Sequence, residues 1–153
     1  MANLAFAVQG GAVRLHMWAF SSELYFFSKV GSTKNVPGIT MLYTHMVQAL
    51  DTAWEWAKSD SRNRSVLLVT DGVPTTCRGR KSTGNPTTDL HAVLEDIRRD
   101  RIVLSILGVG NYQDQYDAAF GQNNYGFVPT MAELPQALEN SARVLVEAYL
   151  RSR

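Results

Sequence analysis

The sequence is poor in cysteine, with Cys77 alone among 153 residues. A single cysteine excludes a disulfide within the chain, which fits a reducing compartment. Cys77 lies in a stretch rich in glycine, arginine and threonine, without histidine or acidic neighbours at catalytic or metal-ligand spacing. We therefore expect it to be an ordinary free thiol and not a nucleophile.

The chain also lacks an excess of charge and a long apolar run. Lys and Arg total 15 against 14 Asp and Glu, giving a formal net charge of +1. Such a balance gives no reason to expect nucleic acid or an acidic membrane as the main partner. No apolar run is long enough to span a membrane, and the N-terminus lacks the pattern of a secretory signal. These features predict a cytoplasmic protein, and its 45% apolar content suffices for one domain with one core.

Strand and helix patterns alternate through most of the chain. The run 65–70, Ser-Val-Leu-Leu-Val-Thr, is nearly all apolar, which is typical of a strand covered on both faces of a parallel sheet. Alternation and helical spacing predict strands at 13–20, 24–27, 65–70, 102–107 and 125–128, and helices at 42–58, 88–99, 112–120 and 131–150, with Thr88 as an N-cap. This order indicates an α/β fold, a doubly wound and mostly parallel sheet with helices on both faces.

The polar residues that follow the strand 65–70 suggest a binding site. Ligands of such sheets bind beyond the carboxyl ends of the strands. Asp71 directly follows the buried strand, with Gly72 to allow a sharp turn and Pro74 to stiffen the exit. Thr44 lies in the first turn of the helix 42–58, so its hydroxyl can reach the same crevice. A carboxylate and a hydroxyl are oxygen ligands suited to Mg²⁺ or Mn²⁺. The simpler alternative is an Asp that only caps a turn.

Two stretches carry a resemblance to a known family. Residues 38–50, with Leu42-Tyr43-Thr44-His45-Met46, and residues 66–74, with Thr70-Asp71-Gly72-Val73-Pro74, resemble the second and third metal-site motifs of von Willebrand factor A domains. The details are similar to the bacterial branch of nitric-oxide-reductase activation proteins and cobaltochelatase-type subunits, as are Gly108-Val109-Gly110 and residues 131–138. The resemblance covers nearly the whole chain and implies one domain, 1–153, with a Rossmann-like fold.

The resemblance also implies a function. In this family a metal ion at the carboxyl edge of the sheet takes a carboxylate from a partner protein, and the bacterial relatives act beside AAA+ ATPases of the MoxR type. It assigns Thr44 and Asp71 as metal ligands. Tyr43, His45, Gly72 and Pro74 become candidates for contact with a partner, which is an AAA+ ATPase or a client enzyme.

The sequence departs from the family at its first motif, Asp-x-Ser-x-Ser, which is missing together with the first, central strand. The domain is therefore expected to be truncated at its N-terminus relative to the family. Two protein ligands rarely hold Mg²⁺ firmly, so we expect weak or absent binding by this chain alone. Asp114 and Asp117 are the nearby-loop carboxylates that could replace the missing ligands.

The missing strand would leave rows of backbone groups unpaired, and each buried one costs about 1–3 kcal/mol. Either the strand 13–20 pairs directly with 65–70, or a second chain supplies a strand. We favour the second chain, hence a homo-oligomer or strand-exchanged dimer.

Other noticeable residues have simpler interpretations. His45 is more simply a surface histidine of a first turn. His16 and His91 share no ligand spacing and are expected to be structural or solvent-facing. Trp54 and Trp56 lie on different faces of one helix, so one is expected in the core and the other partly exposed. The basic run Arg78-Gly79-Arg80-Lys81 could dock an acidic partner or a phosphate, but a solvated, mobile loop is the preferred interpretation.

Two alternatives to a binding module remain. One is a phosphatase-like or hydrolase-like enzyme that uses Asp71 as a nucleophile or metal ligand, although the sequence has no G-x-S-x-G elbow and no phosphate loop. The other is a structural subunit that completes an assembly and binds no metal.

Overall fold

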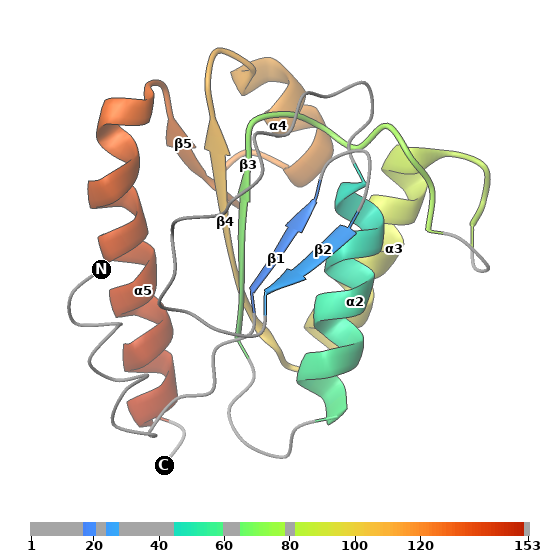
Figure 1. Ribbon diagram of the computed structural model, residues 1–153, viewed down its shortest axis with the longest axis horizontal. Helices are drawn as coiled ribbons and strands as arrows, with labels where there is room; N and C mark the ends of the chain where they lie inside the picture. Colours follow the sequence, from blue (N-terminus) through green and yellow to red (C-terminus); the bar gives the residue numbers. More distant parts are fainter. Residues whose placement is uncertain (1–16, 21–23, 28–44, 60–64, 79–81, 152–153) are drawn as a thin grey trace.

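The computed structural model describes residues 17–20, 24–27, 45–59, 65–78 and 82–151, which form a mixed α/β fold (Figure 1). The elements are β1 (Met17–Phe20), β2 (Leu24–Phe27), α2 (Met46–Ser59), β3 (Ser65–Thr70), α3 (Pro86–Arg99), β4 (Val103–Val109), α4 (Gln113–Phe120), β5 (Gly126–Val128), a 3₁₀ turn (Met131–Glu133) and α5 (Leu134–Arg151). In these ranges no helix combines the length and the apolar character that crossing a membrane requires.

A parallel sheet in the order β3-β4-β5 forms the centre of the fold. Val66 lies opposite Leu104, and Thr70 lies opposite Gly108. The apolar run 65–70 therefore forms the strand that the sequence predicts, and its neighbour is parallel as expected. The strand expected at 102–107 begins one residue later and continues to Val109.

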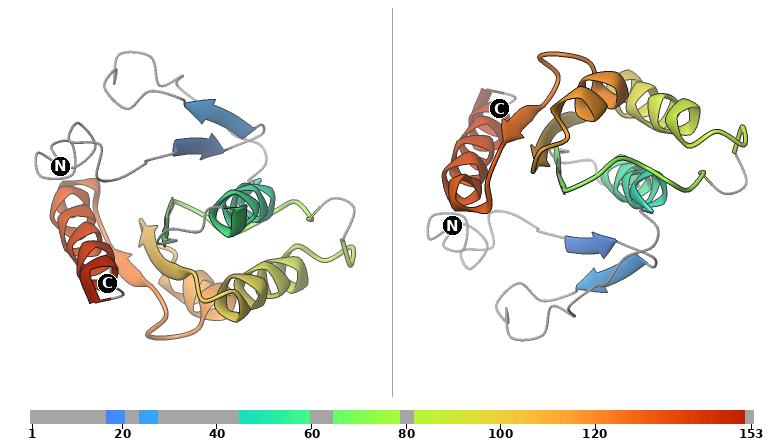
Figure 2. Two further views of the ribbon diagram at one scale, coloured as in Figure 1. Left: turned by 90° about the horizontal axis from the view of Figure 1, so that it is seen from below. Right: turned by 90° about the horizontal axis from the view of Figure 1, so that it is seen from above.

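Helices cover both faces of this sheet (Figure 2). Val66, Leu68 and Ile106 face the larger core, which they share with α2, α3 and α4. Leu107 and Val109 face the opposite side, and with Val128 they pack against Leu134, Ala137 and Leu138 of the last helix. Leu134 and Leu138, four residues apart in sequence, thus lie on the face of α5 that covers the sheet.

β1 and β2 form an antiparallel hairpin that is separate from the parallel sheet. Met17 pairs with Phe27, and β1 lies beside α2. Direct pairing of the strand 13–20 with 65–70 is therefore wrong for the part of the strand that the structure describes, residues 17–20. In the described ranges, β3 pairs with β4 alone. The hairpin therefore packs beside α2 and does not extend the parallel sheet.

The N-terminus of α3 differs from the sequence prediction. The helix begins at Pro86, and its cap is Asn85 instead of Thr88. The Asn85 side chain accepts a hydrogen bond of 3.0 Å from the backbone N–H of Thr88. Proline suits the first helical position because it has no N–H to satisfy. The pair Asn85-Pro86 is thus the start signal, and Thr88 lies inside the first turn.

Replacing Asn85 with alanine should lower the free energy of unfolding by about 1 kcal/mol, because the N–H of Thr88 loses its acceptor. Urea denaturation of the two proteins measures this difference. Asn85→Asp is the control, since aspartate caps equally well and should leave the stability within about 0.5 kcal/mol. An Asn85→Ala protein as stable as the parent would show that another residue caps α3.

Candidate functional site

The loop that carries Asp71 leaves β3 at the edge of the fold where α2 begins (Figure 1). Asp71 is exposed and Gly72 is half-buried. The Thr70 hydroxyl donates to the Gly72 carbonyl at 2.9 Å and accepts from the Gly72 N–H at 3.3 Å. Pro74 is buried, so this part of the loop points into the protein. The first residues after β3 are therefore held in one conformation with the carboxylate of Asp71 outside.

Tyr116 of α4 fills the space beneath this edge. Its side chain is fully buried, and its hydroxyl lies 2.7 Å from the carbonyl oxygen of Val109 and 3.3 Å from that of Thr70. A Cβ atom at Gly108 would lie 2.6 Å from Cδ2 of the Tyr116 ring, so a glycine is needed there. Burial raises the pKa of Tyr116 to about 12, and the negative charge of Asp71 adds to this effect. Tyr116 thus supports the ends of both strands beside Asp71.

The other half of the predicted site lies only partly within the described residues. His45, which directly precedes α2, is half-buried, and its Nδ1 lies 2.6 Å from Oε1 of Gln48. Thr44 and Tyr43 lie outside the described residues. The proximity of the Thr44 and Asp71 oxygens stays a prediction.

Asp114 and Asp117, the suggested replacement ligands, lie on α4. Asp117 accepts a hydrogen bond of 2.7 Å from the Tyr125 hydroxyl, and Asp114 lines a surface depression of about 470 Å³ with Asn111 and Phe127. Within the described ranges, no three His, Cys, Asp or Glu side chains gather closely enough to hold a metal ion. Asp71, Asp114 and Asp117 therefore belong to no such group among the residues that the structure describes.

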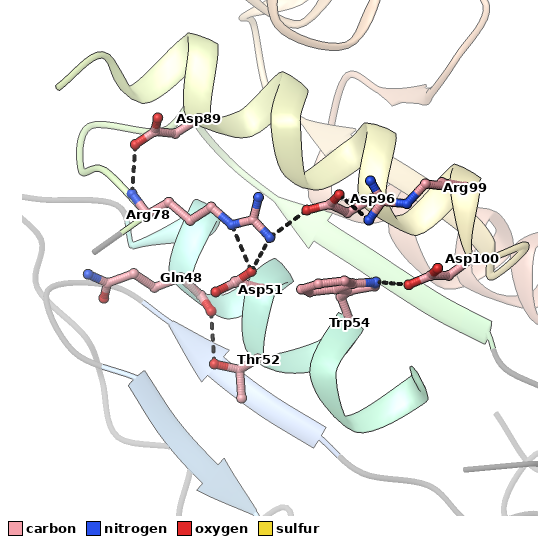
Figure 3. Close-up of polar contacts among 9 residues, drawn as sticks. All are labelled: Gln48, Asp51, Thr52, Trp54, Arg78, Asp89, Asp96, Arg99 and Asp100. Atoms are coloured by element: carbon pink, nitrogen blue, oxygen red, sulfur yellow. Dashed lines mark hydrogen bonds and ion pairs between the residues drawn. The ribbon is translucent and has the colours of Figure 1, made fainter. Parts of the chain in front are cut away.

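The environment of Arg78 differs clearly from the one that the sequence predicts. Its side chain is 4% exposed, so the prediction of a solvated residue in a mobile loop is wrong for Arg78, while 79–81 lie outside the described residues. Its Nε donates to Oδ1 of Asp51 at 2.8 Å, and its Nη2 lies 2.6 Å from that atom and 2.7 Å from Oδ2 of Asp96 (Figure 3). The guanidinium also lies 5.3 Å from the ring centre of Trp54. One cation thus joins the loop to α2 and α3.

The carboxylate of Asp89 binds backbone N–H groups of the same loop. Its side chain is 0% exposed; Oδ2 accepts from the Arg78 N–H at 2.8 Å, and Oδ1 accepts from the N–H and hydroxyl of Thr83 at 2.8 and 2.7 Å. Burial alone would raise the pKa of Asp89, but these hydrogen bonds hold it well below its usual range. The pKa of Asp96 is also lowered, because the hydrogen bond and charge of Arg78 outweigh its burial.

The lowered pKa values of Asp89 and Asp96 predict that the protein loses stability in acid. Their folded pKa values lie below the unfolded value of about 4, so the stabilisation is complete above that pH and is lost as the pH falls through the folded values. The melting temperature, followed by circular dichroism, should be nearly constant from about pH 7 to 5 and fall steeply below about pH 4. The Asp89→Asn protein should show a shallower fall. A profile that is flat down to about pH 2 would contradict this assignment.

The remaining histidine and tryptophans agree with the sequence interpretation. Trp54 is 2% exposed and its Nε1 donates to Oδ2 of Asp100 at 2.8 Å, whereas Trp56 is half-buried. His91 is exposed, and its Nε2 lies 2.9 Å from the carbonyl oxygen of Ala119. Both predictions, one core tryptophan and a solvent-facing or structural His91, are confirmed.

Comparison with protein-family models, with curated proteins and with solved structures gave no match.

Proposed function

We propose that this chain is a protein-binding adaptor module of the von Willebrand factor A type, and that Asp71, Gly72 and the start of α2 form its docking edge. One observation carries the proposal. Asp71 is exposed at the carboxyl end of a parallel strand, on a loop that is fixed at one end by Thr70 and at the other by Arg78. Open α/β sheets bind ligands at this end of their strands. A fixed, exposed carboxylate is suited to recognition with little loss of entropy.

A divalent cation is part of this proposal. Asp71 and Thr44 would hold Mg²⁺ weakly, since two protein oxygens leave most of its coordination to water. When bound, the ion offers a position that a carboxylate of the partner can occupy. The partner proposed from the family resemblance is an AAA+ ATPase of the MoxR type, with which the module would activate a client enzyme or insert its metal.

The properties of Tyr116, which lies beside Asp71, favour binding over catalysis. Tyr116 keeps its proton up to about pH 12, and its hydroxyl is committed to backbone carbonyls. A general acid or base needs a pKa near the working pH. Tyr116 therefore suits a structural support for the loop and does not suit proton transfer to or from a substrate held at Asp71.

The experiment is a binding measurement against a purified MoxR-type ATPase encoded in the same genome. Biolayer interferometry in Mg²⁺ should show association that is lost in EDTA, and Asp71→Ala should weaken it at least about tenfold, the loss expected for a charged contact. Glu139→Ala is the matched control, because Glu139 is an exposed carboxylate of α5. Equal binding by the Asp71→Ala and Glu139→Ala proteins would refute the docking edge.

A structural role in an assembly is the second candidate, and the edge of β3 favours it. In the described part of the chain, β3 pairs on one side only, and the apolar side chain of Leu67 in this strand is 37% exposed. A second copy could add a strand to this edge, which would pair the backbone groups and cover Leu67. Sedimentation equilibrium should show a dimer that Leu67→Lys weakens. A monomer at all accessible concentrations would refute strand addition by a second copy.

A further inference from the structure

Arg78 connects the two elements that meet at the proposed docking edge. Asp51, its closest partner, belongs to the second turn of α2, whose N-terminus lies at that edge. The backbone of Arg78 belongs to the loop that begins with Asp71. The Arg78 guanidinium therefore joins the loop directly to α2, with nitrogen–oxygen distances to Asp51 of 2.6–2.8 Å.

The loop is fixed to α3 by the backbone of Arg78 as well as by its side chain. The N–H of Arg78 is bound by Asp89, and Nη2 contacts Asp96, both of them on α3 (Figure 3). Asp96 has a second cation, because Arg99 lies 2.6 Å from its Oδ1. Loss of the Asp96 contact would therefore leave the loop attached to both helices. Loss of the Asp51 contact would remove the ion pair between the loop and α2, leave the weaker contact of Arg78 with Trp54, and keep the loop attached to α3.

We propose that Arg78 is a positioning residue, which sets the position of Asp71 relative to the start of α2 through its ion pair with Asp51. The inference rests on the proposed function, because the docking edge requires a fixed distance between Asp71 and the start of α2. Arginine suits the task since its planar fork can contact two carboxylates in fixed directions. A lysine ammonium in its place would lack this geometry, so Arg78→Lys should restore the charge and not the spacing.

Asp51→Asn and Asp96→Asn form a matched pair for the test. Each removes one carboxylate charge from Arg78 and keeps the volume of the side chain. Binding of Mn²⁺ to the full chain, measured from the electron paramagnetic resonance of the free ion, reports on the edge. We expect Asp51→Asn to weaken Mn²⁺ binding about tenfold and Asp96→Asn less than about threefold. A tenfold change corresponds to the loss of about one charged hydrogen bond. Equal effects of the two substitutions would overturn the positioning role.

Two further results separate this inference from the proposed function. If the parent protein binds no Mn²⁺, or Asp71→Ala leaves Mn²⁺ binding unchanged, the proposed docking edge fails by itself. Positioning is then decided by hydrogen exchange of the Gly72 and Val73 amides without metal. Asp51→Asn should accelerate that exchange about tenfold more than Asp96→Asn does. Equal acceleration would again overturn the positioning role.

Discussion

The Arg78→Met protein is expected to lose about 3–5 kcal/mol of its free energy of unfolding. Methionine keeps most of the packing beside Trp54, but it leaves the carboxylates of Asp51 and Asp96 without their shared cation. Both carboxylates are largely buried, with 27% and 15% of their side chains exposed, so water replaces the lost contacts poorly. Urea denaturation measures the change.

The control for Arg78 is Arg98, which belongs to α3 and pairs with Glu95. Both of these side chains are more than half exposed, so Arg98→Met should cost less than about 1 kcal/mol. If the Arg78→Met protein is no less stable than the Arg98→Met protein, the buried ion pairs do not stabilise this fold.

The Tyr116→Ala protein should lose a similar amount, about 3–5 kcal/mol, because a fully buried ring is removed from the larger core. The ring stacks on Phe120 at 6.2 Å and meets Tyr125 edge-on at 5.6 Å, and both aromatic contacts are lost with it. Thermal or urea denaturation again measures the effect.

Two further tyrosine variants divide this effect. Tyr116→Phe keeps the ring and removes the hydroxyl that lies against Val109 and Thr70, so it should cost about 1–1.5 kcal/mol. Tyr112→Ala, at a side chain that is 46% exposed, should cost less than about 1 kcal/mol. A Tyr112→Ala protein as unstable as Tyr116→Ala would show that the depth of Tyr116 in the core is not what matters.

Local patterns predicted the parallel sheet and its flanking helices well, because these depend on periodicity. The strand 65–70 is apolar at nearly every position, and the stripe of Leu90, Val93 and Ile97 is spaced at one helical turn. The predicted start of α3 is wrong because Thr88 offers the same cap chemistry as Asn85 three residues later in the sequence. Pro86 is the feature that favours Asn85, since proline suits the first helical position.

The role of Arg78 could not be predicted from its neighbours in sequence. Its partner Asp51 is 27 residues away, and the adjoining glycine and basic residues are typical of a solvated loop. One signal was present on α3, where Asp89 and Asp96 share the helix face of the buried residue Val93. Carboxylates on a buried face require a donor or a cation from elsewhere in the fold. The sequence does not say which residue supplies it.

The pairing of the hairpin is a second feature that pattern alone leaves open. Alternation identifies the strand 13–20 but carries no information on which strand lies beside it. The structure pairs Met17–Phe20 with Leu24–Phe27, its near neighbour in sequence, and this local pairing closes a much smaller loop than pairing with Ser65–Thr70.

Asp71 and the start of α2 are proposed to form one cation-dependent docking edge. Paramagnetic broadening of amide signals by Mn²⁺, followed by NMR in the parent and in Asp71→Ala, tests it most directly. We expect weak binding that broadens Gly72, Val73, His45 and Met46 first, and that disappears in Asp71→Ala. Broadening centred on Asp114 or another carboxylate, or broadening that Asp71→Ala leaves unchanged, would contradict the account.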